Sequence, residues 1–139
     1  MASKKHDFIV SAIARKMRKD GFKVIYLDGR YQDLDENKFN IPPKIINHRP
    51  DIIGEKENIF FCIGEAKTKN DIFTERTKNQ IIDFLTLVKL NSGNKLVMGI
   101  PLNARKDLKK LLIDLKLINQ KQIEIVYIPE ELLPHEKKI

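Results

Sequence analysis

Two short apolar segments of the chain carry acidic residues where their strands would meet. Asp51 opens the segment Asp51–Gly54, and the apolar run that starts at Ile59 leads into Glu65 and Lys67. Side chains alternate between the faces of a strand, so Glu65 and Lys67 should point the same way, roughly 7 Å apart. A hairpin that turns near Asn58 would place Asp51 opposite Glu65. Carboxylates this close repel unless a cation joins them, and hard divalent ions such as Mg²⁺ take oxygen ligands of this kind.

Composition favours one ordinary globular domain that spans residues 1–139. The chain has 139 residues, of which 42% are hydrophobic, so it is long enough to bury a full core. It contains no run of 18 apolar residues and no apolar signal core after Met1, which argues against a membrane span and against secretion. The one cysteine, Cys62, lies in an apolar segment and reads as a small core residue. We therefore expect a cytoplasmic protein with no membrane partner.

The charge balance favours a polyanionic partner. The chain has 26 Lys and Arg against 19 Asp and Glu, a net charge of +7 at pH 7. For a chain of this size the simplest polyanion is nucleic acid, although many basic proteins are merely soluble. Charge alone therefore suggests DNA as a partner without identifying the site that binds it.

Hydrophobic periodicity predicts an alternating α/β chain. Helices are expected over 5–20 and 72–90, with a third that opens at 101–103, and Phe73 is assigned to the apolar face of the second. Asn103 is a plausible cap of the third helix, and Ile118 ends its buried stripe. Besides the two acid-bearing segments, strands are expected over 22–27, 95–100 and 123–128. Residues 28–47 look irregular, with room for a short strand around 44–47.

The resulting order is α-β-β-β-α-β-α-β. The early strands should pair as an antiparallel meander, and the later ones should join through helical crossovers, which gives a mixed sheet flanked by helices. This order, together with Pro50-Asp51 and then Glu65-Ala66-Lys67, resembles the PD-(D/E)XK nuclease superfamily. The superfamily includes restriction endonucleases and Holliday junction resolvases. The resemblance implies a restriction endonuclease-like mixed β-sheet of about five strands. The alternative is an exposed strand end with a solvated salt bridge.

The resemblance also implies a reaction and a cofactor. The family hydrolyses phosphodiester bonds with Mg²⁺, for which Mn²⁺ can substitute, so the chain is expected to be a DNA endonuclease. Asp51 and Glu65 would be catalytic metal ligands, the backbone carbonyl of Ala66 would complete the set, and Lys67 would orient or activate the attacking water. A metal neutralises the phosphate and lowers the pKa of bound water. Small family members commonly act as homodimers, and a homodimer is expected here.

Family members often have a further acid on the first helix. Asp7 is the candidate metal group there, with His6 beside it, although an acid at this place is also favoured by the helix dipole alone. On the second helix, Gln80 stands where RecB-like members have a Gln that touches the site, but Phe84 replaces their Tyr. Gln80 could equally be an exposed helical residue.

The remaining candidates would bind substrate. They are basic or polar residues near the proposed site: Thr68, Lys69, Arg76, Lys78 and His48. The alternatives are that the basic residues form an ordinary solvated helix face and that His48 is a loop histidine without a role. The departures from the family pattern leave a second function open, that of a catalytically inactive nuclease-fold protein for DNA binding or assembly.

Overall fold

Three helices and five strands follow one another in the predicted order. The computed structural model describes residues 4–28 and 39–134. The elements are α1 (Lys4–Lys19), β1 (Lys23–Leu27), β2 (Ile52–Lys56), β3 (Phe60–Ala66), α2 (Glu75–Val88), β4 (Lys95–Pro101), α3 (Arg105–Asp114) and β5 (Ile123–Ile128). Short 3₁₀ turns follow β3, β4 and β5: η2 (Lys69–Asp71), η3 (Leu102–Ala104) and η4 (Glu130–Leu132).

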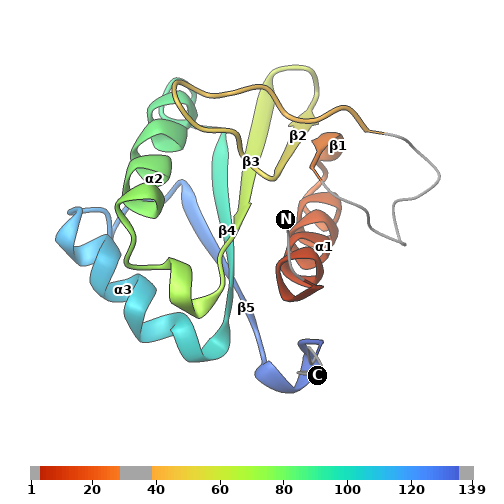
Figure 1. Ribbon diagram of the computed structural model, residues 1–139. Helices are drawn as coiled ribbons and strands as arrows, with labels where there is room; N and C mark the ends of the chain where they lie inside the picture. Colours follow the sequence, from red (N-terminus) through yellow and green to blue (C-terminus); the bar gives the residue numbers. More distant parts are fainter. Residues whose placement is uncertain (1–3, 29–38, 135–139) are drawn as a thin grey trace.

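The strands form one open mixed sheet in the order β1-β2-β3-β4-β5 (Figure 1). β1, β2 and β3 pair antiparallel, whereas β3, β4 and β5 pair parallel and are joined through α2 and α3. The predicted meander and helical crossovers are therefore confirmed. Because β3 and β4 both end at the same edge of the sheet, the connections that leave them start close together. We call this edge the carboxyl edge.

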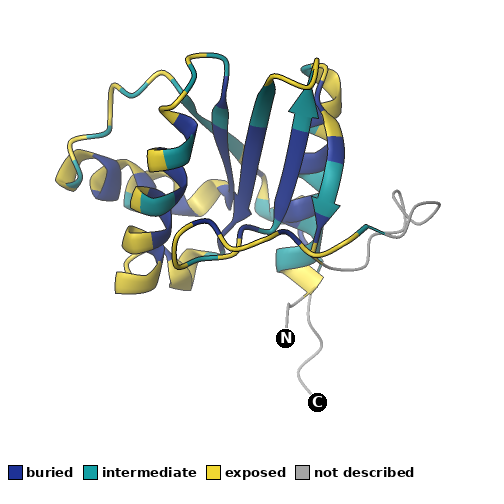
Figure 2. Ribbon diagram, turned by 90° about the horizontal axis from the view of Figure 1, so that it is seen from above, coloured by how far each residue is buried: buried dark blue, intermediate teal, exposed yellow. Residues whose placement is uncertain are grey.

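The sheet is buried between helices on both faces (Figure 2). α1 packs on one face through Ile9, Val10, Ile13, Ala14 and Met17, against a cluster that includes Cys62 and Val97. α2 and α3 cover the other face, where their apolar residues meet Ile53, Ile63 and Met98. Alternate residues of β3 thus serve two cores, as a central strand requires.

Small residues bring α1 unusually close to the sheet. A Cβ atom built on Gly64 would overlap Ile52 Cγ2 and lie 2.7 Å from Ile13 Cγ2. A Cβ atom on Gly99 would lie 2.6 Å from Ile9 Cγ2. Both distances are far below ordinary van der Waals contact, so the helix occupies space that only glycine leaves free.

Four predicted boundaries are wrong. α2 begins at Glu75 rather than at residue 72, because Thr74 caps it by accepting a hydrogen bond from the Thr77 amide at 3.1 Å. Phe73 consequently lies outside the helix and is 56% exposed. β4 continues through Pro101, and α3 starts after η3 with Ala104, not Asn103, at its cap position. Ile118 lies beyond α3 and is 42% exposed.

The connection between β1 and β2 contains no strand among its described residues, 39–51. Where a short strand had room to form, an isolated bridge joins Ile45 and His48. The part of the predicted irregular stretch over 29–38 lies outside the described residues. None of the helices in the described ranges is long and apolar enough to cross a bilayer.

Cys62 is a core residue, as predicted. It is 1% exposed in the middle of β3, and burial raises the pKa of its thiol to about 12. The thiolate is the reactive form, so native protein at pH 8 should not react with a disulfide reagent such as DTNB, whereas urea-unfolded protein should release one equivalent of thiol per chain. Rapid reaction of the native protein would contradict the burial of this strand.

Candidate active site

The β2–β3 hairpin places Asp51 opposite Glu65, as predicted. Ile52 pairs with Gly64, and the Asp51 amide donates a hydrogen bond to the Gly64 carbonyl at 3.2 Å. The turn is tight because Glu57 and Asn58 both adopt φ of 57°, in the left-handed region. The two acids therefore meet at the carboxyl edge.

Asp51 is held as an ionised carboxylate. Its Oδ2 accepts a hydrogen bond from the Ala66 amide at 2.8 Å and lies 3.2 Å from His6 Nε2. Burial works to raise the pKa of Asp51, but hydrogen bonds with His6 and Glu65, together with the charge of His6, outweigh it and hold this pKa below its usual value. The side chain remains 15% exposed, so the carboxylate is accessible from the edge.

Glu65 is more deeply buried than Asp51, and its ionised form is the less favourable of the two. Its side chain is 5% exposed, its Oε2 lies 3.4 Å from Lys67 Nζ, and its buried Oε1 receives no hydrogen bond from any donor in the described residues. Burial first, and then the neighbouring charge of Asp51, raise the pKa of Glu65 well above its usual value. Burial and the facing carboxylate thus both favour the protonated form of Glu65.

Lys67 continues β3 past its assigned end. Its amide donates to the Gly99 carbonyl of β4 at 3.0 Å, and the side chain is 10% exposed. Its ammonium lies 3.4 Å from Glu65 Oε2, an oxygen that can accept a hydrogen bond in either protonation state of the acid. The side chain of Ala66, between the two, belongs to the core beneath α1. The structure thus brings Asp51, Glu65 and Lys67 together.

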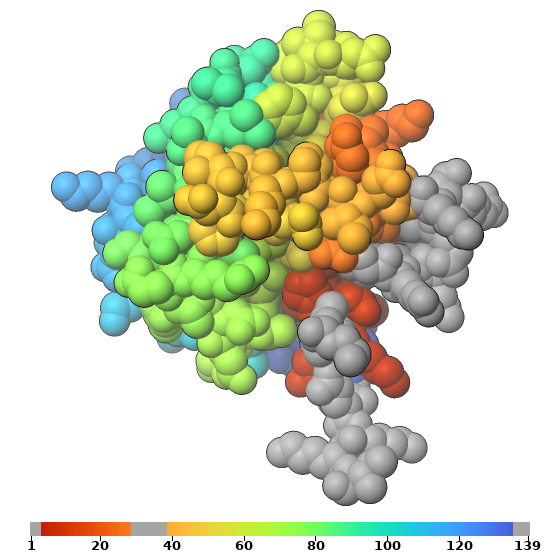
Figure 3. All heavy atoms as spheres, turned by 45° about the horizontal axis from the view of Figure 1, so that its top comes forward, coloured from red at the N-terminus to blue at the C-terminus, as the bar shows by residue number. Residues whose placement is uncertain are grey.

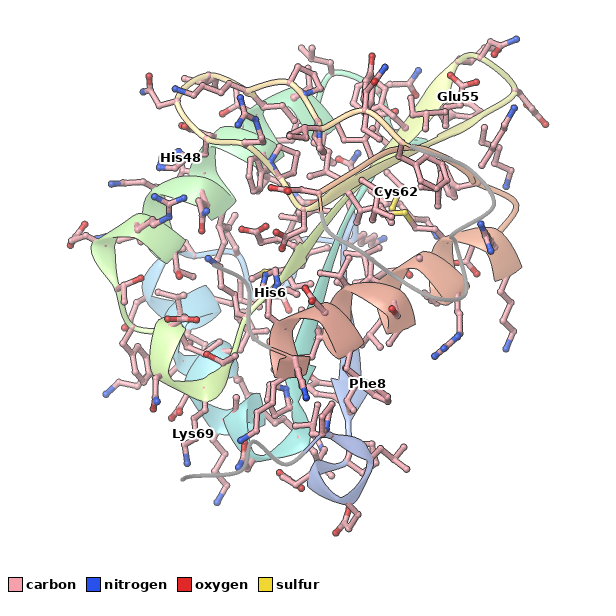
Figure 4. All side chains as sticks on the ribbon, turned by 45° about the vertical axis from the view of Figure 1, so that its right-hand side comes forward. His6, Phe8, His48, Glu55, Cys62 and Lys69 are labelled. Carbon is pink, nitrogen blue, oxygen red and sulfur yellow. The ribbon has the colours of Figure 1, made fainter. Side chains whose placement is uncertain are left out.

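α1 contributes His6 rather than Asp7 to the contact with Asp51. His6 lies at the start of the helix, beside the carboxyl end of β3 (Figure 4). Its hydrogen bond with Asp51 raises its pKa against the opposing effect of burial. Asp7 borders the site, with Oδ1 3.9 Å from His6 Nδ1. The resemblance singled out both residues, but which one faces the strands depends on how α1 is rotated against the sheet.

Gln80 lies on the buried side of α2. α2 runs back antiparallel to β3, so its first turns cover the carboxyl end of the sheet. Gln80 is 3% exposed there, and its Oε1 has no hydrogen-bond partner among the described residues. Buried polar atoms are nearly always paired, so an unpaired one at this end of the sheet suits a residue that receives a ligand or water. The alternative of an exposed helical Gln80 is wrong.

The other predicted substrate residues lie in the segment after β3, on α2 or in the loop before β2. The Thr68 hydroxyl donates to Asp71 at 2.8 Å, whereas Lys69 (Figure 4), Arg76 and Lys78 are exposed along the segment after β3. His48 is held elsewhere. Its Nδ1 lies 2.7 Å from Asp83 Oδ2 on α2.

The contact between His48 and Asp83 fastens the loop that leads into Asp51. The Asn47 amide also donates to Asp83, at 3.2 Å. His48 stands three residues before Asp51, so this double attachment fixes the approach of the chain to the site. The position of His48 fits such a supporting role at least as well as direct contact with substrate.

The donor set suits a hard cation. No group of three or more His, Cys, Asp or Glu side chains in residues 4–28 and 39–134 is arranged as a complete metal site. Mg²⁺, however, usually binds through one or two carboxylates and keeps several waters. Asp51 and Glu65 supply two carboxylates, and the buried Glu65 Oε1 has no donor to satisfy it. A cation would compete with His6 for Asp51 Oδ2 and would favour the ionised form of Glu65.

No protein-family model, curated protein or solved structure matches this chain. The fold and the arrangement of the site therefore carry the functional argument by themselves.

Proposed function

We propose that the chain is a Mg²⁺-dependent nuclease that hydrolyses phosphodiester bonds in DNA, as an endonuclease with a restriction endonuclease-like fold. The observation that carries the proposal is the pairing of Asp51 with the buried Glu65, with Lys67 3.4 Å from Glu65. Two facing carboxylates destabilise a fold unless something compensates for their repulsion. A cation bound by both carboxylates would offset their repulsion, and beside the Lys67 ammonium it could also take part in catalysis.

The residues divide the work in a simple way. Bound at the acids, Mg²⁺ or Mn²⁺ would neutralise the phosphate and lower the pKa of a water molecule. Asp51 and Glu65 hold the cation, with the Ala66 carbonyl as a further oxygen ligand. Lys67 orients the attacking water or stabilises the charge that develops at phosphorus. Gln80, with its unpaired buried oxygen, positions water or substrate from the α2 side.

DNA is the substrate that the charges favour. The chain carries a net charge of +7, and Lys69, Arg76 and Lys78 are exposed along the segment next to the acids. Lysine and arginine contacts to phosphate supply most of the affinity for nucleic acid and make it sensitive to salt. One site of this kind cuts one strand, so cleavage of both strands calls for a homodimer.

The test is an incubation of the purified chain with supercoiled, linear, branched and single-stranded DNA. Cleavage is expected with Mg²⁺ or Mn²⁺ and should stop in EDTA, because the acids alone do not activate water. Alanine at Lys67 should reduce the rate about 10²-fold or more, since one stabilising charge is lost. Failure of every DNA to be cut, or cleavage that persists in EDTA, would refute the proposal.

A non-catalytic DNA-binding or assembly protein is the second candidate. It is favoured by the ion pairs of Asp51 with His6 and of Glu65 with Lys67, which already offset both acids without a cation. It predicts salt-sensitive DNA binding without hydrolysis, and a melting temperature that Mg²⁺ does not change. A metal site would instead stabilise the fold by about 2.7 kcal/mol at a cation concentration of 100 times Kd.

A further inference from the structure

Phe73 exposes an aromatic ring at the carboxyl edge. It lies between η2 and α2, in the segment that leaves β3 directly after Lys67, and 56% of its surface is exposed. Singly exposed apolar side chains are common, but this ring adjoins the candidate site, so what it can contact there bears on the substrate. In Figure 3 this light green segment and the red start of α1 lie on the same face of the molecule.

The exposure is built into the backbone. Ile72, the preceding residue, is 0% exposed and anchors the turn in the core beneath α2. The Asp71 carbonyl accepts hydrogen bonds from the hydroxyls of Thr74 and Thr77, at 3.1 and 2.6 Å. With the chain fastened on both sides of Phe73, the ring cannot fold inward without breaking the helix cap.

One lysine lies over the ring, and two more cations are exposed on the same segment. Lys110 of α3 lies with Nζ 5.9 Å from the ring centroid, and Lys69 and Arg76 are exposed on the same segment. Two acids, Asp71 and Glu75, also lie here, and Asp71 is occupied by the hydroxyl of Thr68. An apolar ring among cations does not fit an apolar protein partner, but it fits a polyanion that also offers flat apolar faces. A nucleic acid with an unpaired base has both.

Resting on the proposed function, we propose that Phe73 stacks on an unpaired base and that the substrate is DNA with a junction between duplex and single strand near the scissile bond. In a continuous duplex each base face is covered by its neighbours, and exposing one costs unstacking energy. An unpaired base presents its face without that cost. Lys110 and Lys69 contact the flanking phosphates, and the acids act on the strand that passes Phe73.

The experiment compares binding of three DNAs of the same sequence: a blunt duplex, a splayed fork and a single strand. Binding is measured by fluorescence anisotropy in EDTA, where hydrolysis does not proceed. Wild-type protein should bind the fork about tenfold more tightly than the duplex, the size expected for one base stacked on an aromatic ring. Phe73→Ala should lose this preference, and Phe73→Tyr should keep it.

Leu90→Ala is the matched control. Leu90 is 76% exposed just beyond the end of α2, so its truncation removes apolar surface far from the carboxyl edge. This variant should bind all three DNAs as wild type does, and both alanine variants should melt as wild type does. A 2-aminopurine placed at the unpaired position should change its fluorescence with wild type and not with Phe73→Ala.

The outcomes separate the two proposals. Equal binding of fork and duplex by wild type, or a preference that survives Phe73→Ala, overturns the role of Phe73. If Mg²⁺-dependent cleavage is nonetheless observed, the nuclease proposal stands. If wild type neither binds nor cuts any of the DNAs, both proposals are overturned.

Discussion

Glu65→Gln should abolish cation-dependent cleavage while making the protein more stable at alkaline pH. Gln keeps the shape of Glu65 but cannot become an anion, so the cation loses a ligand and the rate should fall by about 10³-fold or more. The same change removes an acid that burial and Asp51 make costly to ionise. Loss of activity with a gain in stability distinguishes a functional carboxylate from a structural one.

The pH dependence follows from the direction of the shift. The folded state raises the pKa of Glu65 above its ordinary value of 4.5, so it binds this proton more tightly than the unfolded state does. Stability from this group is full below about pH 4.5 and is lost as the pH rises through the raised value. In that window wild type should lose at most about 1.4 kcal/mol of unfolding free energy per pH unit relative to Glu65→Gln.

Urea unfolding at a series of pH values, in EDTA, measures this difference. Glu57→Gln is the control, because Glu57 is an exposed carboxylate in the turn of the same hairpin. It should retain both cleavage and the wild-type pH dependence. A Glu65→Gln variant that still cuts DNA would remove Glu65 from the site. If the unfolding free energies of wild type and Glu65→Gln changed in parallel with pH, the folded state would not raise the pKa of Glu65.

Gly64→Ala should destabilise the protein although it adds a single methyl group. The new Cβ would overlap Ile52 Cγ2 and lie within 2.8 Å of both Ile13 Cγ2 and Met17 Cε, and these atoms are buried on all sides. α1 must move away from the sheet to make room. Overpacking of this kind costs about 1–3 kcal/mol, which corresponds to a fall in melting temperature of about 4 °C per kcal/mol.

The displacement should also reach the site, since α1 places His6 against Asp51 at 3.2 Å. Thermal denaturation of Gly64→Ala and Gly54→Ala tests the effect. At Gly54 the nearest atoms to a new Cβ, Phe22 Cβ and the Lys23 carbonyl oxygen, lie 3.2 and 3.3 Å away and need to yield only slightly. Gly54→Ala should therefore lose less stability. An equal or smaller loss in Gly64→Ala would show that α1 is not held this closely.

The hairpin with its two acids was predictable because both signals are local. Strand alternation fixes the side on which Glu65 and Lys67 lie, and the midpoint between Asp51 and Glu65 falls at residue 58, where the structure turns. The order of helices and strands was equally predictable, because apolar residues recur with different spacings in helices and in strands. These predictions needed no knowledge of distant contacts.

A helix cap and tertiary contacts decide what the sequence pattern got wrong or left open. Phe73 fits the apolar period of α2, but the cap at Thr74 starts the helix after it and leaves the ring outside. The choice between His6 and Asp7 depends on how far α1 rotates, which Gly64 and Gly99 set from 50 and more residues away. The burial of Gln80 likewise follows from the packing of α2 on β3 and β4, not from its polar neighbours in sequence.

The single buried cysteine makes the proposed DNA surface open to site-specific labelling. Cys62 is the only cysteine of the chain and is 1% exposed, so no native thiol has to be removed first. A thiol introduced by Lys78→Cys on the exposed side of α2 would be the one position that takes a fluorophore, spin label or photocrosslinker. Distances from such a probe to the ends of a bound oligonucleotide would trace the path of the strand across the protein.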